Sequence, residues 1–186
     1  MTASGSVKGD ERLRLFLGFP LPEPASRSVS RWQHEQLGVE RVRIVPAENL
    51  HVTIAFLGSR PAAETGPIGD ALREAAAGVA QPVLTPLRYR ETRSVGMLVL
   101  EDEGKRATRI AEQAHRLLAA LGVYEPERRP WLPHVTVVRF RERPRLAPSI
   151  PDLGPVTMSD AAVYMSRLRP TGAQYEVVES VPLGGG

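Results

Sequence analysis

The chain has 186 residues, of which 42% are hydrophobic and 24% are charged, a composition typical of a globular protein with a sizeable core. Its formal net charge is only +3 although its pI is near 9.7. This mild basic excess fits a polyanionic ligand but is too small to indicate tight binding to a nucleic-acid duplex, and an arginine-rich composition bias explains it equally well.

The absence of cysteine excludes disulfides and cysteine metal sites, and it is compatible with the reducing cytoplasm in which we expect the protein. No window approaches eighteen apolar residues, so no membrane span is predicted. The first residues lack the apolar core of a signal peptide. We expect one domain over residues 1–186, with flexible tails at 1–11 and 184–186, and a monomer as the default.

Strand and helix patterns alternate along the chain. Period-two or apolar runs predict strands, helical spacing of apolar residues predicts helices, and Gly122 follows the clearest helix at a C-cap position. The predicted strands cover 12–19, 42–45, 50–58, 82–91, 95–101, 133–140, 154–168 and 173–183, and the helices lie within 20–38 and over 67–79 and 105–121.

Helices interspersed among paired strands favour an α+β fold with antiparallel sheets over a doubly wound parallel sheet. The first strand is not followed by a G-x-G-x-x-G sequence, and no Walker motif is present. Nucleotide-binding folds of those two kinds are therefore not supported.

The tripeptide His-Val-Thr occurs twice, at residues 51–53 and 134–136, each time at the start of a predicted strand. Because residues i and i+2 of a strand share a face, each strand should present a His/Thr front and an apolar back. The two motifs lie 83 residues apart, about half the chain length. A duplication with two lobes related by a pseudo-twofold axis would bring both fronts onto one central cleft.

Two imidazoles facing each other suit proton transfer near neutral pH, one accepting a proton while the other donates one. Two threonine hydroxyls and an imidazolium can bind the oxygens of an anion. This set fits phosphodiester hydrolysis without a metal, and no third ligand for zinc or carboxylate pair for magnesium accompanies either motif. A lone strand histidine is usually only a satisfied polar residue, but two equivalent occurrences favour function. His34 and His115 are expected to face solvent.

The segments "RLFLGFPLP", "VPAENLHVTIAFLG", "PHVTVVRFR" and "VYMSRLRPTGAQYEVVESVPL" together resemble the 2H phosphoesterase superfamily. The most similar branch is the RNA 2′,3′-cyclic phosphodiesterases, also called 2′-5′ RNA ligases. The resemblance runs from about residue 12 to 183 and is loosest over 82–101, where relatives often carry a tryptophan and this chain has Met97.

The resemblance implies a bilobal α+β fold, with two antiparallel sheets lining a central cleft and helices outside, and no metal cofactor. It implies hydrolysis of a terminal 2′,3′-cyclic phosphate on RNA to a 2′-phosphate, and 2′-5′ RNA ligase activity. By this match His51 protonates the departing 3′ oxygen, His134 activates water, and Thr53 and Thr136 complete the catalytic set. The expected partner is an RNA end or a cyclic nucleotide.

Phe56 and Arg139 each lie five residues after their histidine, and the resemblance implies that they contact the base or phosphate of the substrate. Strict alternation places an i+5 residue on the opposite face, so a bulge or strong twist is required. Core packing is the alternative for Phe56, whereas an unpaired charge among apolar residues would be costly for Arg139. Tyr164 and the arginines of "PERRP" are weaker candidates for the rim.

Two other functions fit the motifs. One is a catalytically idle RNA-binding module that keeps the fold, although both intact His-x-Thr pairs argue against it. The other is a 2H enzyme acting on a different small phosphoester, such as ADP-ribose 1″,2″-cyclic phosphate or a 2′-5′ oligoadenylate.

Overall fold

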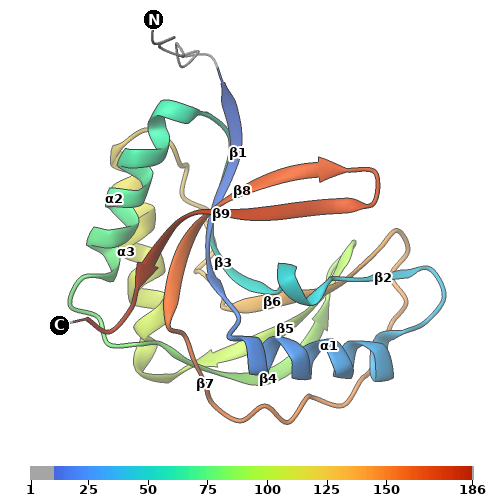
Figure 1. Cartoon of the computed structure of the whole chain (residues 1–186). Helices are drawn as coiled ribbons and strands as arrows, with labels where there is room; N and C mark the ends of the chain where they lie inside the picture. Colours follow the sequence, from blue (N-terminus) through green and yellow to red (C-terminus); the bar gives the residue numbers. More distant parts are fainter. Residues whose placement is uncertain (1–10, 186) are drawn as a thin grey trace, which may run out of the picture.

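The computed structural model of the protein describes residues 11–185, so the tails predicted at 1–11 and 184–186 lie largely outside the described residues. The chain alternates strands with three α-helices (Figure 1). The strands are β1 (Arg12–Pro20), β2 (Val42–Ile44), β3 (His51–Pro61), β4 (Val83–Glu91), β5 (Val95–Asp102), β6 (His134–Phe140), β7 (Val156–Thr157), β8 (Asp160–Arg169) and β9 (Gly172–Pro182), and the helices are α1 (Glu23–Leu37), α2 (Thr65–Ala76) and α3 (Arg106–Ala120).

The predicted α+β class is confirmed, and every strand pair is antiparallel. The single strand predicted over 154–168 is wrong, because two strands occupy this stretch. β7 pairs with β4 and β8 pairs with β1, at distant places in the sheet. Fully buried Met158 lies between them, and its N–H donates to the Pro82 carbonyl over 2.9 Å. The chain therefore leaves one end of the sheet and crosses to the other at this residue.

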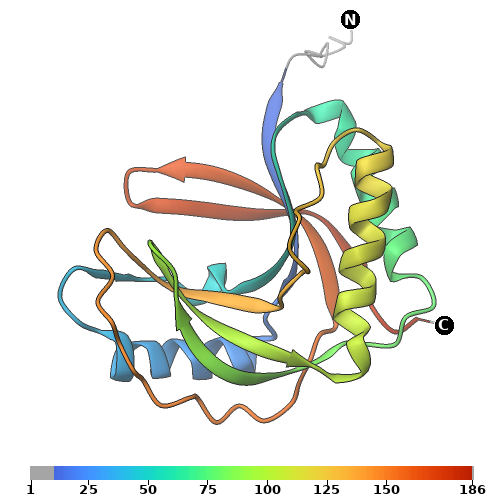
Figure 2. The ribbon, with the colours of Figure 1, turned by 180° about the vertical axis from the view of Figure 1, so that it is seen from behind.

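Within the described chain the strands form one curled sheet in the order β7-β4-β5-β6-β3-β1-β8-β9, with β2 paired to β6. Two separate sheets were expected, and this is a correction. The two halves remain hydrogen-bonded because β3 and β6 share one residue pair, Val52 with Val135. Beyond that pair the two strands have no further partners in each other, and the halves of the sheet turn apart (Figure 2).

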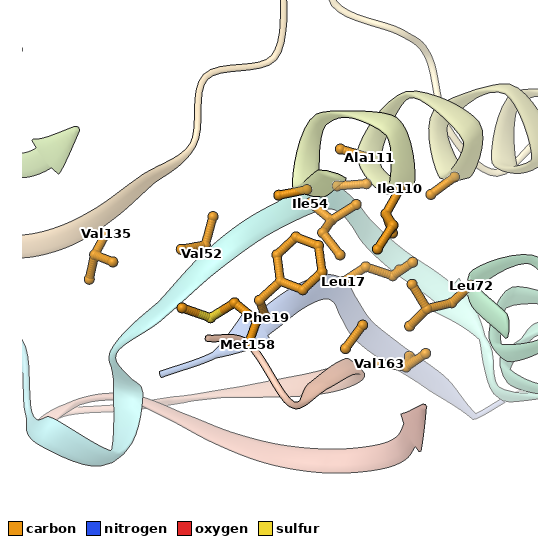
Figure 3. Packing of buried hydrophobic residues seen from close by; sticks show 14 of the residues in the cluster. Leu17, Phe19, Val52, Ile54, Leu72, Ile110, Ala111, Val135, Met158 and Val163 are labelled. Atoms are coloured by element: carbon orange, nitrogen blue, oxygen red, sulfur yellow. The ribbon is translucent and has the colours of Figure 1, made fainter. Parts of the chain in front are cut away.

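The helices cover the two halves separately. α2 and α3 pack together beside β3 and β8, whereas α1 lies under the half that contains β2 and β6 (Figures 1 and 2). Figure 3 shows side chains of β1 and β3, such as Phe19 and Ile54, packed against Leu72 of α2 and Ile110 of α3. In residues 11–185 no helix has the length and apolar composition that a membrane crossing requires.

The apolar stripe predicted for helix 105–121 is confirmed over most of its length. Ile110, Ala114 and Leu118 are fully buried. Leu121, which was included in the stripe, is 47% exposed. The helix ends at Ala120, and Gly122 adopts a positive φ of 71° that turns the chain away, as a C-terminal glycine permits.

Leu118→Ala is expected to lower the free energy of unfolding by about 2–5 kcal/mol, because it leaves a cavity in a packed core. Leu121→Ala is the matched control at the end of the same helix, and it should cost less than about 1 kcal/mol because the side chain is already half in water. Urea denaturation of both variants measures the difference. Equal losses would show that α3 does not bury the face described.

Candidate active site

The two His-Val-Thr strands are built alike. In the seven residues from His51 and in the seven from His134, the first and third are half-buried, the sixth is exposed and the others are buried. Val52 and Val135 are at most 1% exposed. The predicted His/Thr front and apolar back are therefore confirmed on both strands, and the similarity continues past the tripeptide.

A bulge follows each tripeptide at the same offset. Ile54 has no register partner in β1, and Val137 has none in β5. An extra residue in one strand shifts the alternation of side chains by one position. The sixth residue of each motif, Phe56 or Arg139, is therefore exposed and lines the same cavity as the fronts. The required bulge is present. The alternative expectation, that Phe56 packs in the core, is wrong because the residue is 52% exposed.

The cavity in front of the two strands has a volume of about 510 Å³. His51, Thr53 and Thr136 line it together with Phe56 and Arg139. His134 is not one of the lining residues, but it lies close enough for its charge to act on His51. Among the lining residues that the structure describes, none is acidic and four are arginines, at positions 14, 43, 139 and 169. The site is therefore suited to an anion.

Both catalytic candidates are held through the same ring nitrogen. Nδ1 of His51 is 2.7 Å from the Asn49 carbonyl, and Nδ1 of His134 is 2.8 Å from the Leu132 carbonyl. Because a carbonyl only accepts, each Nδ1 carries the proton and Nε2 is the nitrogen available for proton transfer. In His51 this Nε2 is 3.0 Å from Oγ1 of Thr53, whose hydroxyl donates to it.

Burial lowers the pKa of His51 to about 4, with a smaller contribution from the positive charges of His134 and Arg139. The hydrogen bond to the Asn49 carbonyl opposes this shift. The ring lies 4.8 Å from the centroid of Phe16 and 5.3 Å from that of Tyr175. In the free protein His51 is therefore neutral near pH 7.

Gly18 leaves the space that this arrangement needs. It is the β1 partner of Thr53, and a Cβ at this position would come within 3.2 Å of Cδ2 of His51 and 3.0 Å of the Val52 carbonyl oxygen. Both distances are shorter than ordinary van der Waals contact. With a side chain at position 18, the imidazole and the neighbouring backbone would have to shift by a few tenths of an ångström.

The β8–β9 hairpin forms another wall of the cavity, and of its residues the sequence had proposed only Tyr164 for the rim. Arg169 and Tyr175 line the cavity from it. Asn49, just before β3, links this wall to the first His-Val-Thr strand, because its Nδ2 donates to the Ala173 carbonyl over 2.8 Å. Arg43, the register partner of Arg139, joins from β2. These residues come together only through long-range pairing, so no local pattern marks them.

The weaker rim candidates do not line the cavity. Tyr164 is 6% exposed and stacks on Phe16 at 4.7 Å, which places it within the aromatic cluster beside His51, and burial raises its pKa. Arg128 and Arg129 are exposed on the loop before β6. Among residues 11–185, no three His, Cys, Asp or Glu side chains come together as a metal site requires.

Only one of the two remaining histidines faces solvent. His34 is exposed, as expected, and contacts the Ser30 carbonyl of its own helix. The expectation for His115 is wrong. This residue is half-buried, its ring stacks on Tyr124 at 4.8 Å, and its Nε2 donates to the Ile54 carbonyl over 2.7 Å. It lies at the edge of the α3 stripe, where it reaches β3.

The chain matches the protein family described as LigT like Phosphoesterase over residues 19–85. It is 26% identical over 179 residues to the RNA 2′,3′-cyclic phosphodiesterase of Methanocaldococcus jannaschii, with 90% of this chain and 99% of that protein covered. It is 28% identical over 196 residues to the RNA 2′,3′-cyclic phosphodiesterase of Geobacillus stearothermophilus, where 94% of this chain corresponds to 59% of the relative.

Solved structures share the fold. A crystal structure of a Thermus thermophilus protein superposes with a TM-score of 0.79 at 27% identity, covering 93% of this chain and 99% of that one. E. coli LigT crystallised with 3′-AMP gives a TM-score of 0.79 at 21% identity, covering 94% of this chain and 100% of that one. These comparisons confirm the resemblance to the 2H phosphoesterases and to their LigT-like branch.

The His51 imidazole is expected to titrate near pH 4 in the free protein, and inorganic phosphate should raise this midpoint because an anion stabilises the imidazolium. Side-chain NMR across a pH series measures both values. An unfolded chain binds the His51 proton below about pH 6.5 and the folded chain does so only near pH 4, so the free energy of unfolding falls as pH drops through that window.

Arg139→Met removes one nearby charge, and it should raise the His51 midpoint only slightly because burial is the larger cause. A midpoint near 6.5 in the unmodified protein would contradict the buried geometry.

Proposed function

We propose that this chain, which resembles the LigT-like 2H phosphoesterases, hydrolyses the terminal 2′,3′-cyclic phosphate of RNA to a 2′-phosphate. The observation that carries the proposal is one cavity lined by His51, Thr53 and Thr136 together with four arginines, with His134 close enough for its charge to act on His51. Both curated relatives, which are similar over most of this chain, are named RNA 2′,3′-cyclic phosphodiesterase.

The cavity supplies two kinds of recognition. A cyclic phosphate is a monoanion, and Arg139 and Arg43 are register partners on neighbouring strands that both line the site. Phe56 offers an exposed aromatic face for a nucleobase, with the Arg14 guanidinium carbon 4.9 Å from its ring centroid. We infer that the phosphate lies between the histidines and that the base lies toward Phe56.

We assign His51 as the proton donor to the departing 3′ oxygen and His134 as the acceptor that activates water. The His134 proton sits on Nδ1 facing the Leu132 carbonyl, which leaves Nε2 free to take a proton from water. His51 is neutral in the free protein. A phosphate monoanion bound against it offsets the added positive charge, so His51 is protonated together with substrate binding.

In the proposed reaction the water oxygen bonds to phosphorus, the bond from phosphorus to O3′ breaks, and the proton from His51 goes to O3′. The products are a 2′-phosphate and a 3′-hydroxyl. A 5′-hydroxyl of a second RNA in the place of water gives a 2′-5′ linkage by the same bond changes. Ligase activity is therefore part of the proposal as an alternative outcome at one site.

The duplication predicted from the repeated tripeptide also belongs to this proposal. In each half a strand and a helix precede a His-x-Thr strand, β1-α1-β3 with β2 inserted before β3, and β5-α3-β6. The order of the sheet reads β5-β6-β3-β1 across its centre. Both His-x-Thr strands carry their bulge at the same offset. These correspondences support a pseudo-twofold axis through the pair Val52 and Val135.

RNA ending in a 2′,3′-cyclic phosphate, incubated with the protein and EDTA, is expected to yield a 2′-phosphate end. Product analysis by mass spectrometry with a phosphatase-sensitivity assay identifies the end group. ADP-ribose 1″,2″-cyclic phosphate and a 2′-5′ oligoadenylate serve as competing substrates. Loss of activity with the chelator, or no turnover of any cyclic phosphate, would overturn the proposal, and faster turnover of a competing substrate would reassign it.

His51→Ala and His134→Ala are each expected to lower kcat by about 10²–10⁴-fold, the usual contribution of a general acid or base. His34→Ala, on an exposed helix position, is the matched control and should leave kcat unchanged. Steady-state kinetics on the cyclic-phosphate RNA measures all three. Full activity in either of the first two variants would exclude the assigned site.

The change of the residual rate with pH distinguishes the proton donor from the proton acceptor. In the His134→Ala variant the remaining rate should fall as pH rises through the pKa of His51, because a donor must be protonated. A rate that rises with pH would exchange donor and acceptor.

A further inference from the structure

We propose that His115 and Gln33 are positioning residues that hold the two strand bulges and thereby aim Phe56 and Arg139 into the cavity. The observation behind this is a matched pair of contacts. His115 Nε2 donates to the Ile54 carbonyl over 2.7 Å, and Gln33 Nε2 donates to the Val137 carbonyl over 2.6 Å. Ile54 and Val137 each lack a register partner, in β1 and β5 respectively, at the same offset from their histidines, and β3 has a second such residue at Leu57.

A bulge creates a need for such partners. The extra residue interrupts the ladder, and its backbone groups must find hydrogen bonds elsewhere. Ile54 is 2% exposed and Val137 is fully buried, so water is not freely available to hydrogen-bond their backbone groups. An unpaired buried carbonyl costs free energy, and a neighbouring side chain that donates to it removes this cost. His115 supplies such a donor for the Ile54 carbonyl, whereas the Val137 carbonyl accepts from both Gln33 and the Val45 N–H.

The two donors cross between the halves of the molecule. α1 lies between β1 and β3 in the sequence, but its Gln33 contacts β6. α3 lies between β5 and β6, but its His115 contacts β3. Each helix thus supports the His-x-Thr strand of the other half. Two chemically different side chains thus donate to the bulge residue at the same offset in the two strands. This correspondence supports a role for the bulge in placing the side chain that follows it.

Gln33 occupies its position at a cost. The residue is fully buried, and its Nε2 also donates to the Val45 carbonyl over 3.1 Å, but its Oε1 has no hydrogen-bond partner among the described residues. A buried amide oxygen without a partner is destabilising. An apolar side chain would avoid this penalty but could not donate to Val137.

The consequence of the bulges is seen at the sixth residue of each motif. Without the extra residue, strict alternation would turn Phe56 and Arg139 toward the core side. With it, both side chains are exposed and line the cavity. His51 and His134 precede the bulges, so their placement does not depend on them. Loss of a donor should therefore weaken substrate binding more than it slows the chemical step.

The test compares His115→Ala with His115→Gln, whose amide can replace the ring N–H as Gln33 does on the other strand. On cyclic-phosphate RNA, His115→Ala should raise KM by about 3- to 10-fold, the scale of one uncharged hydrogen bond, with kcat changed less than about 2-fold. His115→Gln should restore KM. His34→Ala is the control. The increase of KM in Gln33→Ala should be smaller than in His115→Ala, because the Val45 N–H still donates to the Val137 carbonyl over 3.0 Å.

A double variant asks whether His115 acts through Phe56. If it does, His115→Ala combined with Phe56→Ala has the KM of Phe56→Ala alone, because the side chain to be aimed is already gone. If the double variant instead shows the combined effect of both single substitutions on KM, the inference is overturned. It is also overturned if His115→Ala lowers the thermal stability of the protein and leaves KM unchanged. That last result would describe a residue that only stabilises the fold.

The kinetic readout rests on the proposed function, and amide hydrogen exchange does not. His115→Ala should exchange faster over residues 51–61 and not over 134–140, and His115→Gln should resemble the unmodified protein. If the unmodified protein hydrolyses no cyclic phosphate, the proposed function fails and exchange alone decides this inference. Unchanged exchange over 51–61 in His115→Ala would overturn it whatever the activity.

Discussion

One backbone pairing determines the layout of the site. Val52 and Val135 form the single register pair between β3 and β6, and it joins the two halves of the sheet. Because the strands run antiparallel, the residue before each valine lies at the same end as the residue after the other. His51 is thereby placed near Thr136, and His134 near Thr53. The hydroxyl that contacts the His51 ring is that of Thr53 in its own strand, 3.0 Å from Nε2, and both valines are buried in the core.

The same pairing explains why a cavity exists between the halves. Beyond this pair the facing edges of β3 and β6 part, and their backbone groups need other partners. Trp131 donates its indole N–H to the Thr53 carbonyl over 3.0 Å, and the Val45 N–H donates to the Val137 carbonyl. Hydrogen bonds from a side chain and from loop backbone thus take the place of further hydrogen bonds between β3 and β6. Partners of this kind lower the cost of parting the two strands, and we propose the resulting opening as the binding site.

The sequence predicted what depends on local periodicity and missed what depends on which strands meet. The alternation in each motif identified the His/Thr fronts, and the offset of Phe56 and Arg139 identified the need for a bulge. Arg43 and Tyr175 could not be found, because only the pairing of β2 and the path of the β8–β9 hairpin bring them to the cavity. The contact of His115 likewise depends on β3 lying beneath α3, which the helix's own stripe does not show.

Two identical tripeptides need unlike surroundings if one histidine is to act as acid and the other as base. The difference arises in the neighbouring strands. Thr53 is paired with Gly18, whereas its counterpart Thr136 is paired with Met97. The missing side chain at position 18 lets the His51 ring settle among buried aromatic groups, and this burial is the largest cause of its lowered pKa. The two like motifs therefore have unlike neighbours, a glycine beside Thr53 and a methionine beside Thr136.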